Sequence, residues 1–246
     1  KRNLNAIQKL NQRGGRMLSV VDLFEDGTLD RKLINFFIRR IWSGDSILAA
    51  AGPSGTGKTT LMGALLNLIP PGIRIQTAES GDPIGAKVSS SLHMAHELND
   101  APYYGYIWGT EARQFLKLAQ DSQLMATLHA ESLEGIRNKV TGQPVGLSKK
   151  GFEELDLVIT MKKRRQGREV TRRVKEIYGF SGGAHRQLFK WNAGDDSYEE
   201  VKPIAERKNR EEKFNQFDQE GFLDRLLAKR PKRLNEVREF LLEFAS

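Results

Sequence analysis

Short apolar runs and amphipathic segments alternate through the middle of the chain. The apolar runs predict buried β-strands at 46–51, 73–78, 103–108, 123–128 and 155–161. The amphipathic segments between them predict α-helices at 58–69, 86–98, 110–120 and 131–140. Because strands that alternate with helices in this way usually lie parallel in one sheet, the pattern predicts an α/β core.

The pattern differs on either side of this core. The first 45 residues predict helices, the second of them capped by Asp26 or Thr28. After residue 161, alternating residues predict a series of β-hairpins. From Ile204 onward the chain is charged and helical, with two amphipathic helices divided at Pro231.

The core begins with a complete phosphate-binding motif. Residues 52–59, GPSGTGKT, match G-x-x-x-x-G-K-T between a predicted strand and a predicted helix, which is the context that the motif requires. Its glycines allow backbone N–H groups to approach a phosphate closely, and the helix that starts near Lys58 points its positive end at that phosphate. We expect the Lys58 ammonium to reach the β- and γ-phosphate oxygens and the Thr59 hydroxyl to coordinate Mg²⁺. The predicted nucleotide-binding residues are Gly52, Pro53, Ser54, Gly55, Thr56, Gly57, Lys58, Thr59 and Thr60.

Composition limits the other possibilities. The chain has no cysteine, which excludes disulfides and thiolate metal sites, and its four histidines lack metal-ligand spacing. No apolar run reaches roughly 18 residues, so we expect no direct insertion into a membrane. The net charge of +8 is densest in KKRRQGREVTRRVK, residues 162–175. This segment is either a solvated β-hairpin that turns at Gln166-Gly167 or an arginine cluster that reaches a phosphate or an acidic partner.

A carboxylate follows the predicted strand at 73–78. This strand ends beside Glu79, and in open α/β sheets ligands bind beyond the carboxyl ends of the strands. We therefore expect Glu79 to face the nucleotide.

Four stretches in this order resemble the secretion and pilus-assembly ATPases of the type II and type IV systems. GPSGTGKTTLMGALLNLIPPGIRIQTAES is similar to that family's phosphate loop and acidic "Asp box", with Glu79 or Asp82 as the box carboxylate. ATLHAES, residues 126–132, is similar to its "His box", with His129 as the histidine. Residues 155–175 resemble the strand and Arg-bearing hairpin that follow this box, and residues 213–240 resemble the helical end of archaeal members.

The resemblance implies a cytoplasmic ATPase, peripheral to the membrane, that uses ATP and Mg²⁺. Glu79 or Asp82 would hold Mg²⁺ through water, and His129 would sense the γ-phosphate. The implied partners are further copies of the chain in a homo-hexamer and a membrane-embedded secretion or pilus platform protein; nucleic acid is not expected. Members also have an N-terminal domain with basic groups, which we expect this chain to lack because it begins at Lys1 and is too short to contain one. We therefore expect good binding of ATP–Mg²⁺ and slow hydrolysis.

One stretch departs from the family's pattern. Members carry an apolar strand followed by G-E-x-R-G, whose glutamate is the catalytic base, whereas this chain reads YYGYIWGTE at 103–111. Aligning the glycines puts Tyr106 in the place of the glutamate and Trp108 in that of the arginine. Glu111 is the nearest carboxylate and a candidate substitute. The catalytic candidates are therefore Lys58, Glu79, His129 and Glu111, and the metal ligands Thr59 and Glu79.

The predicted fold is α/β, a P-loop NTPase with a RecA-like, mainly parallel sheet flanked by helices, a β-hairpin annex and a small C-terminal helical region. We divide the chain into a helical lead-in (1–45), the ATPase core with its hairpins (46–202) and the helical region (203–246). Three functions remain open. They are a motor ATPase for secretion or pilus assembly, a degenerate nucleotide-binding module with little hydrolysis, and a nucleic-acid translocase of related fold that uses residues 162–175.

Overall fold

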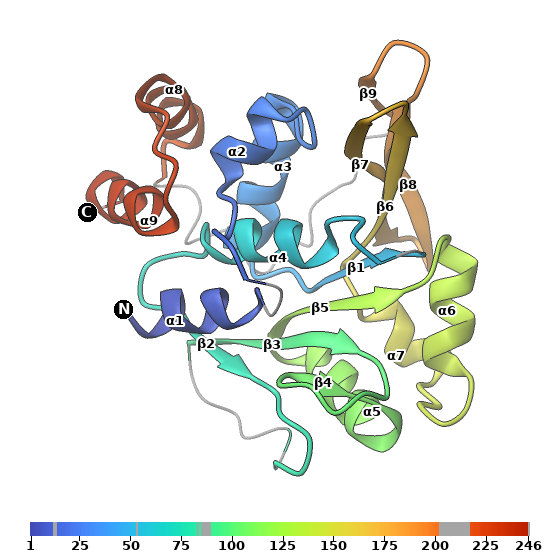
Figure 1. Cartoon of the computed structure of the whole chain (residues 1–246). Helices are drawn as coiled ribbons and strands as arrows, with labels where there is room; N and C mark the ends of the chain where they lie inside the picture. Colours follow the sequence, from blue (N-terminus) through green and yellow to red (C-terminus); the bar gives the residue numbers. More distant parts are fainter. Residues whose placement is uncertain (12–13, 53, 83, 85–89, 202–216, 246) are drawn as a thin grey trace.

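The computed structural model describes residues 1–11, 14–52, 54–82, 84, 90–201 and 217–245 (Figure 1). The strands are β1 (Ile47–Ala51), β2 (Arg74–Thr77), β3 (Ser91–Leu98), β4 (Tyr106–Ile107), β5 (Gln123–His129), β6 (Leu157–Gln166), β7 (Glu169–Ser181), β8 (Ala184–Asn192) and β9 (Ser197–Glu200). The α-helices are α1 (Arg2–Lys9), α2 (Val20–Glu25), α3 (Arg31–Trp42), α4 (Lys58–Leu66), α5 (Gly109–Lys117), α6 (Leu133–Thr141), α7 (Lys149–Glu153), α8 (Gln219–Lys229) and α9 (Leu234–Phe244). A short 3₁₀ helix, Leu118–Gln120, follows α5.

One sheet joins the strands of the described residues in the order β2-β3-β5-β1-β6-β7-β8-β9, with β4 paired to the end of β3. The strands from β2 to β6 run parallel, and those from β6 to β9 pair antiparallel. All five residues of β1 are buried, as expected for a central strand covered on both faces. The predicted α/β fold with a mainly parallel sheet and a β-hairpin annex is confirmed.

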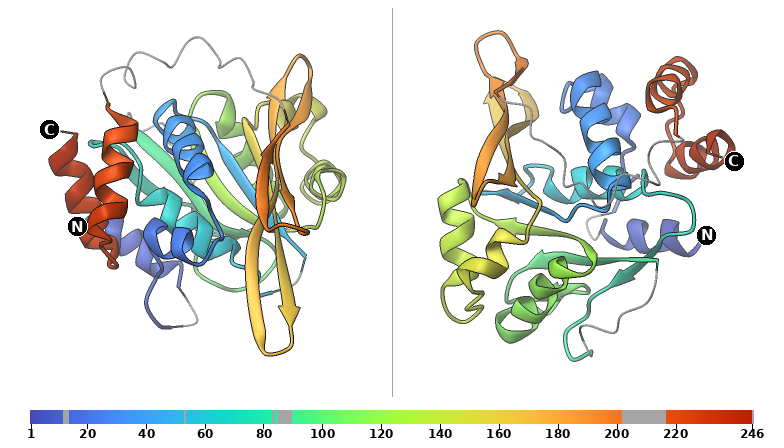
Figure 2. Two further views of the ribbon diagram at one scale, coloured as in Figure 1. Left: turned by 90° about the horizontal axis from the view of Figure 1, so that it is seen from above. Right: turned by 180° about the vertical axis from the view of Figure 1, so that it is seen from behind.

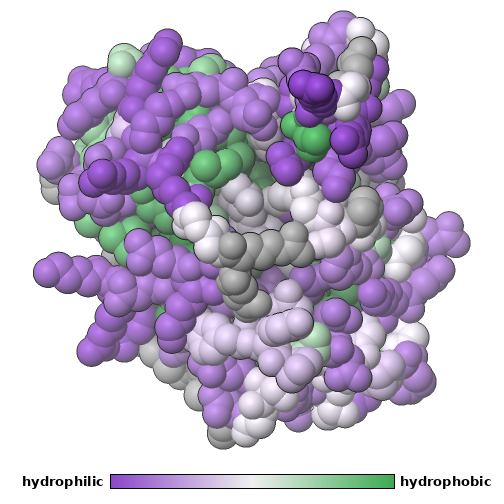
Figure 3. Space-filling view, in the orientation of Figure 1, coloured by the Kyte–Doolittle hydropathy of each residue, from purple (hydrophilic) through white to green (hydrophobic). Residues whose placement is uncertain are grey.

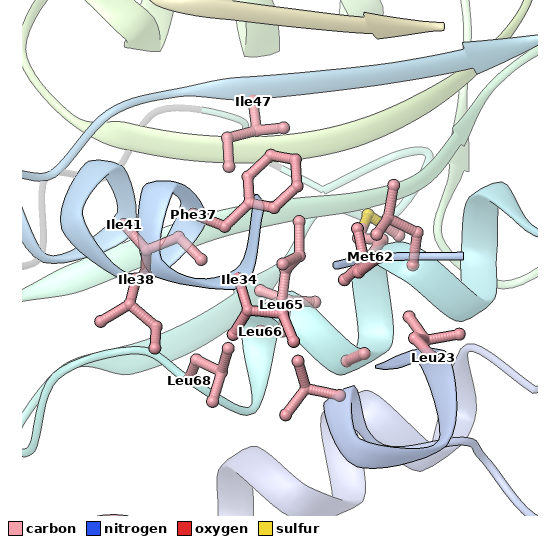
Figure 4. Close-up of a cluster of buried hydrophobic side chains, with 14 of the residues drawn as sticks. Leu23, Ile34, Phe37, Ile38, Ile41, Ile47, Met62, Leu65, Leu66 and Leu68 are labelled. Carbon is pink, nitrogen blue, oxygen red and sulfur yellow. The ribbon is translucent and has the colours of Figure 1, made fainter. Parts of the chain in front are cut away.

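Helices cover both faces of the parallel strands (Figures 1 and 2). On one face, residues of α1–α4, α8 and α9 form a hydrophobic core with the sheet; on the other, residues of α5, α6 and α7 form a second core. Leu33, Phe37 and Ile41 of α3 recur every four residues, so they lie on one face of the helix, and all three are fully buried. Figure 4 shows Phe37 and Ile41 in the cluster that α3 forms with α4, with Phe37 beside Ile47 at the start of β1.

The face of the molecule that Figure 3 shows is largely hydrophilic, and hydrophobic residues appear on it chiefly over the helical part at upper left. None of the helices in the described ranges has the length and apolar character needed to cross a lipid bilayer.

The predicted cap of the helix before the phosphate loop is wrong. The segment forms two helices, α2 and α3, because Gly27 adopts a left-handed backbone (φ +71°) between them. The cap of α3 is Asp30, whose carboxylate accepts a hydrogen bond from the Leu33 amide at 2.7 Å. The Thr28 hydroxyl instead donates to the carbonyl of Arg172, 3.0 Å away, and so joins this turn to β7.

The predicted helix at 86–98 is wrong wherever the structure describes it. Residues 86–89 lie outside the described part of the chain, and Ser91–Leu98 form strand β3, which lies between β2 and β5. Buried polar side chains, His93, His96 and Glu97, interrupt its apolar residues and imitate a helical repeat. The aromatic strand predicted at 103–108 is reduced to the two residues of β4.

The two ends of the predicted architecture are confirmed where they are described. The β6–β7 hairpin turns after Gln166 and extends away from the body of the molecule (Figure 2). Helices α8 and α9 lie on either side of Pro231, as predicted. Residues 202–216, the first part of the predicted helical region, lie outside the described residues.

Candidate nucleotide-binding and catalytic site

A cavity of about 690 Å³ lies over the phosphate loop. Its described lining comes from the ends of β3, β4 and β5, from β6 and β7, and from residues that follow α1. The described lining residues are Ser54 to Thr60 of the loop; His96, Glu97, Tyr103, Tyr106 and His129; Met161 and Arg172; and Leu10, Asn11, Gly14, Arg16, Met17, Leu18, Leu23, Asp26 and Thr28. A cavity of this size is within the usual range for small-molecule sites.

The phosphate loop has the backbone that the motif predicts. It connects the end of β1 to the first turn of α4, and Gly55 (φ +75°) and Gly57 (φ +100°) both adopt left-handed conformations that favour glycine. Gly57 is the N-cap of α4, so the positive end of this helix opens into the cavity. Of the nine predicted loop residues, Pro53 lies outside the described part of the chain, and Gly52 directly follows β1.

Three charged or ionisable side chains meet beside this loop. The ammonium of Lys58 lies 3.3 Å from His129 Nδ1 and 3.9 Å from Glu97 Oε1, and its side chain is only 6% exposed. His129 Nε2 lies 2.7 Å from the same Glu97 oxygen. Burying an ammonium in this way is costly unless a nearby carboxylate offsets the charge, which Glu97 does.

His129 contacts both the phosphate loop and Glu97. Its Nδ1 atom lies 2.8 Å from the carbonyl oxygen of Gly52. Its Nε2 atom lies 2.7 Å from Oε1 of Glu97. Lys139 donates to the backbone carbonyl of His129 at 3.0 Å and helps to hold the end of β5. The predicted placement of His129 beside the phosphate loop thus agrees with the structure.

Glu97 is the residue of this cluster that sequence reasoning missed. It stands at the carboxyl end of β3, two strands from β1, with β5 between them. The strand that delivers a carboxylate toward Lys58 is therefore β3, whereas Tyr106 belongs to the short strand β4 beside it. The signal was present in SLHMAHEL, residues 91–98, which has the length of a strand and carries Glu97 one residue before its end, but its polar residues favoured a helix.

Three predicted carboxylates lie elsewhere. Glu79, Asp82 and Glu111 are not among the described residues that line the cavity. Glu79 follows β2, which is three strands from β1, or about 14 Å across the sheet at the usual strand spacing. The Glu111 carboxylate accepts hydrogen bonds from the Ser80 hydroxyl at 2.8 Å and the Gly81 amide at 2.8 Å. It therefore ties α5 to the loop after β2, which corrects its expected role as a substitute base.

The basic hairpin reaches the phosphate loop with two of its side chains. Lys163 donates to the carbonyl of Ser54 at 3.3 Å, and Arg172 Nε donates to the carbonyl of Gly55 at 3.0 Å. Arg173 forms a two-pronged ion pair with Asp196, with both N–O distances 2.7 Å, which anchors the base of the hairpin. The segment is thus a largely exposed hairpin with two cations at the loop. That these cations reach a phosphate, the second of the two alternatives, stays a prediction.

The residues present suit Mg²⁺ only as part of a nucleotide complex. Among the described residues, no group of three or more histidines, cysteines or carboxylates is placed to hold a metal ion. Mg²⁺ usually needs one or two protein oxygens and takes its other ligands from phosphates and water. Thr59, in the first turn of α4 and on the cavity wall, supplies a hydroxyl of this kind.

Comparisons with known proteins give distant likenesses. No family model matches the chain. An uncharacterized protein of Methanocaldococcus jannaschii, MJ1287, is 25% identical over 210 residues, which cover 72% of this chain and 77% of that protein.

Two solved structures of ATPases also resemble parts of the chain. The VirB11 ATPase from the Brucella suis type IV secretion system, in complex with sulphate, is 21% identical with a TM-score of 0.43, covering 65% of this chain and 54% of VirB11. The Legionella pneumophila ATPase DotB is 16% identical with a TM-score of 0.46, covering 68% of this chain and 52% of DotB. The chain therefore spans about half the length of each of these two proteins.

Proposed function

We propose that this chain is the ATP-binding motor domain of a secretion or pilus-assembly ATPase and that it hydrolyses ATP with Mg²⁺. The observation that carries the proposal is the meeting of Lys58, Glu97 and His129 at the phosphate loop. A phosphate loop alone binds a nucleotide, whereas hydrolysis also needs a carboxylate or an equivalent group that orients water. Glu97 supplies this group.

The geometry supports the following division of roles. The loop amides and the start of α4 bind the β-phosphate, and Lys58 stabilises charge on the transferring phosphoryl group. Glu97 orients a water for in-line attack on the γ-phosphorus and accepts its proton while the bond from phosphorus to the β–γ bridging oxygen breaks. His129 holds Glu97 and the Gly52 carbonyl. The Thr59 hydroxyl would hold Mg²⁺ together with the phosphates, and the ion would supply positive charge that stabilises the transferring phosphoryl group.

Glu97 changes the balance between the three functions left open by the sequence. The degenerate module was attractive because Tyr106 stands where the catalytic glutamate was expected. A carboxylate beside Lys58 removes that reason and favours the motor ATPase. The translocase remains an alternative that rests on the charge of the hairpin, and it predicts DNA affinity that falls steeply with salt.

The wider setting follows from the sequence resemblance. We propose a homo-hexamer in the cytoplasm that acts on a membrane-embedded platform protein, with core and helical regions divided near residues 45 and 202. Arginines supplied by a neighbouring subunit or domain commonly raise turnover by about 10³–10⁵-fold, so the isolated chain is expected to be slow.

The test is steady-state ATP turnover with Mg²⁺ over a range of protein concentrations, beside Lys58→Ala. We expect turnover that rises per chain with concentration and is abolished in the variant, because assembly completes the site. Tight ATP binding without turnover at any concentration would support the degenerate module instead. A wild-type chain that does not bind ATP at all would overturn the proposal.

A further inference from the structure

Tyr106 lies beside Glu97 because β4 pairs with the end of β3. In this parallel pair Tyr106 is the register partner of Glu97. The pairing begins at Gly105, whose carbonyl accepts from the His96 amide at 2.8 Å. Gly105 has a left-handed backbone (φ +74°), and a Cβ at this position would lie 2.5 Å from Cγ of His96. Only glycine therefore lets β4 approach β3 closely enough to place Tyr106 there.

The Glu97 carboxylate is held from two sides by different strands. Its Oε1 atom faces Nε2 of His129 from β5 at 2.7 Å, and its Oε2 atom accepts a hydrogen bond from the Tyr106 hydroxyl of β4 at 3.2 Å. The Glu97 side chain is only 8% exposed, so water can reach its carboxylate in few of the orientations that the side chain could adopt. Each carboxylate oxygen has two lone-pair positions, and these contacts leave acceptor capacity for a water.

The last torsion of a glutamate side chain has no sharp preference of its own. It joins a tetrahedral to a planar carbon, and its energy profile is broad. A single contact to His129 would leave the carboxylate able to rotate about that contact. Two contacts on opposite oxygens fix its plane, which is what a base needs to meet the proton of an attacking water.

We propose that Tyr106 is a positioning residue for ATP hydrolysis, which fixes the orientation of the Glu97 carboxylate through its hydroxyl. The inference rests on the proposed function, because it assigns Glu97 to the attacking water. Tyr106 and Glu97 both line the cavity over the phosphate loop. Alignment of the glycines placed Tyr106 at the position of the family's catalytic glutamate. In the structure, Tyr106 instead contacts Glu97, which takes that role in the proposed mechanism.

The ring of Tyr106 is placed independently of its hydroxyl. It packs edge-on against the ring of Tyr103, with centroids 5.2 Å apart and planes at 68°. Tyr106→Phe therefore removes the hydrogen bond to Glu97 while it keeps the ring packing. Tyr104→Phe is the matched control, since Tyr104 is in the same loop, is not among the described cavity-lining residues, and packs its ring against His96.

The experiment measures kcat, KM and the Kd of MgATP for the full chain and these variants, with thermal unfolding to compare stability. For Tyr106→Phe we expect kcat to fall about tenfold, in line with the loss of a hydrogen bond to a charged group, and KM, Kd and Tm to stay near wild type. Tyr104→Phe should keep the wild-type kcat. Single-turnover hydrolysis of radiolabelled ATP, followed for hours, is then measured for Glu97→Gln and for the double variant. Because Tyr106 acts through Glu97, Tyr106→Phe should lower the single-turnover rate almost no further in the Glu97→Gln background.

Each result decides between the two proposals. A normal kcat in Tyr106→Phe, a kcat loss equal to that of Tyr104→Phe, or a full additive loss in the double variant would overturn the role of Tyr106 alone. A Glu97→Gln variant as active as wild type would overturn the assignment of Glu97, and the role of Tyr106 with it. A wild-type chain that binds MgATP without turnover would overturn hydrolysis, and again the Tyr106 role with it.

Discussion

Nε2 of His129 lies 2.7 Å from Oε1 of Glu97, so the carboxyl ends of β5 and β3 meet beside the phosphate loop. Glu97 and His129 are far apart in sequence, but their strands, β3 and β5, are neighbours in the sheet. Lys58 approaches both side chains from the start of α4. The order of the strands in the sheet therefore brings the site residues together. We expect substitutions of these residues to have different effects.

Removal of the Glu97 carboxylate tests its role as the base. We expect Glu97→Gln to lower kcat by on the order of 10²–10⁴-fold, since the amide cannot accept the proton of the attacking water. The Kd of MgATP should change little, because the loop and Lys58 still bind the phosphates. Phosphate release and calorimetric titration with ATP measure the two quantities.

Glu111→Gln is the matched control for this charge change. Glu111 binds Ser80 and Gly81 and is not among the described cavity-lining residues, so its loss should leave kcat near wild type. Equal losses of kcat in both variants would show that the effect comes from charge or stability and not from position.

Replacement of His129 tests the link between the phosphate loop and the base. We expect His129→Asn to lower kcat by at least about tenfold, because Glu97 loses the ring nitrogen beside Oε1 and the Gly52 carbonyl loses its contact with the ring. ATP affinity should fall less than kcat. His185→Asn is the control, since His185 contacts the Leu155 carbonyl and is not among the described residues that line the cavity. A variant with normal kcat would limit His129 to packing.

The fold and the part of the site formed by the phosphate loop and His129 could be predicted because both depend on patterns that are local in sequence. The phosphate loop is local, because its glycines, Lys58 and the flanking strand and helix are contiguous and each residue type has one use in that geometry. His129 was also found, because it stands directly at the end of an apolar strand. The β6–β7 hairpin followed from its alternation and from Gly167, which adopts a left-handed backbone (φ +61°).

The positions of Glu97 and Glu79 relative to the phosphate loop depend on the order of the strands in the sheet, which pairs segments that are distant in sequence. Glu97 belongs to a central strand that carries buried His93 and His96, and periodicity alone cannot separate such a strand from a helix. Glu79 was expected at the nucleotide because its strand end is at the correct edge of the sheet. The chain, however, places β3 and β5 between β2 and β1, which moves Glu79 to the side. Strand order is not written in any local pattern.

Burial of His96 makes stability depend on pH. Burial lowers the pKa of His96 to about 4, and the nearby Lys9 ammonium adds to the shift. Between this value and the unfolded pKa near 6.5, the unfolded chain binds more protons, so the free energy of unfolding falls as the pH falls. The full difference is about 3 kcal/mol for this residue. It is present above roughly pH 6.5 and lost as the pH approaches 4.

Urea unfolding at several pH values measures this dependence. His96→Gln should lower stability at pH 7.5 and reduce its fall between about pH 6.5 and 4.5, because glutamine does not titrate. Burial also lowers the pKa values of His93 and His185, so part of the dependence remains in the variant. An unchanged pH dependence in His96→Gln would show that His96 does not contribute to it.

The ion pair between Arg173 and Asp196 stabilises the hairpin annex. The Arg173 side chain is 8% exposed, whereas that of Asp196 is 53% exposed, so solvent screens part of the interaction. Asp196 has a left-handed backbone (φ 54°), which asparagine also tolerates, and its Oδ1 accepts from the Trp191 indole. Asp196→Asn keeps these features and removes the charge. We expect a loss of about 1 kcal/mol in unfolding free energy, measured with urea, since a buried guanidinium loses its charged partner.

The control is Asp195→Asn, an equal charge change at an exposed neighbour whose described partner is Ser197. A loss of similar size in both variants would assign the effect to net charge and not to the pair.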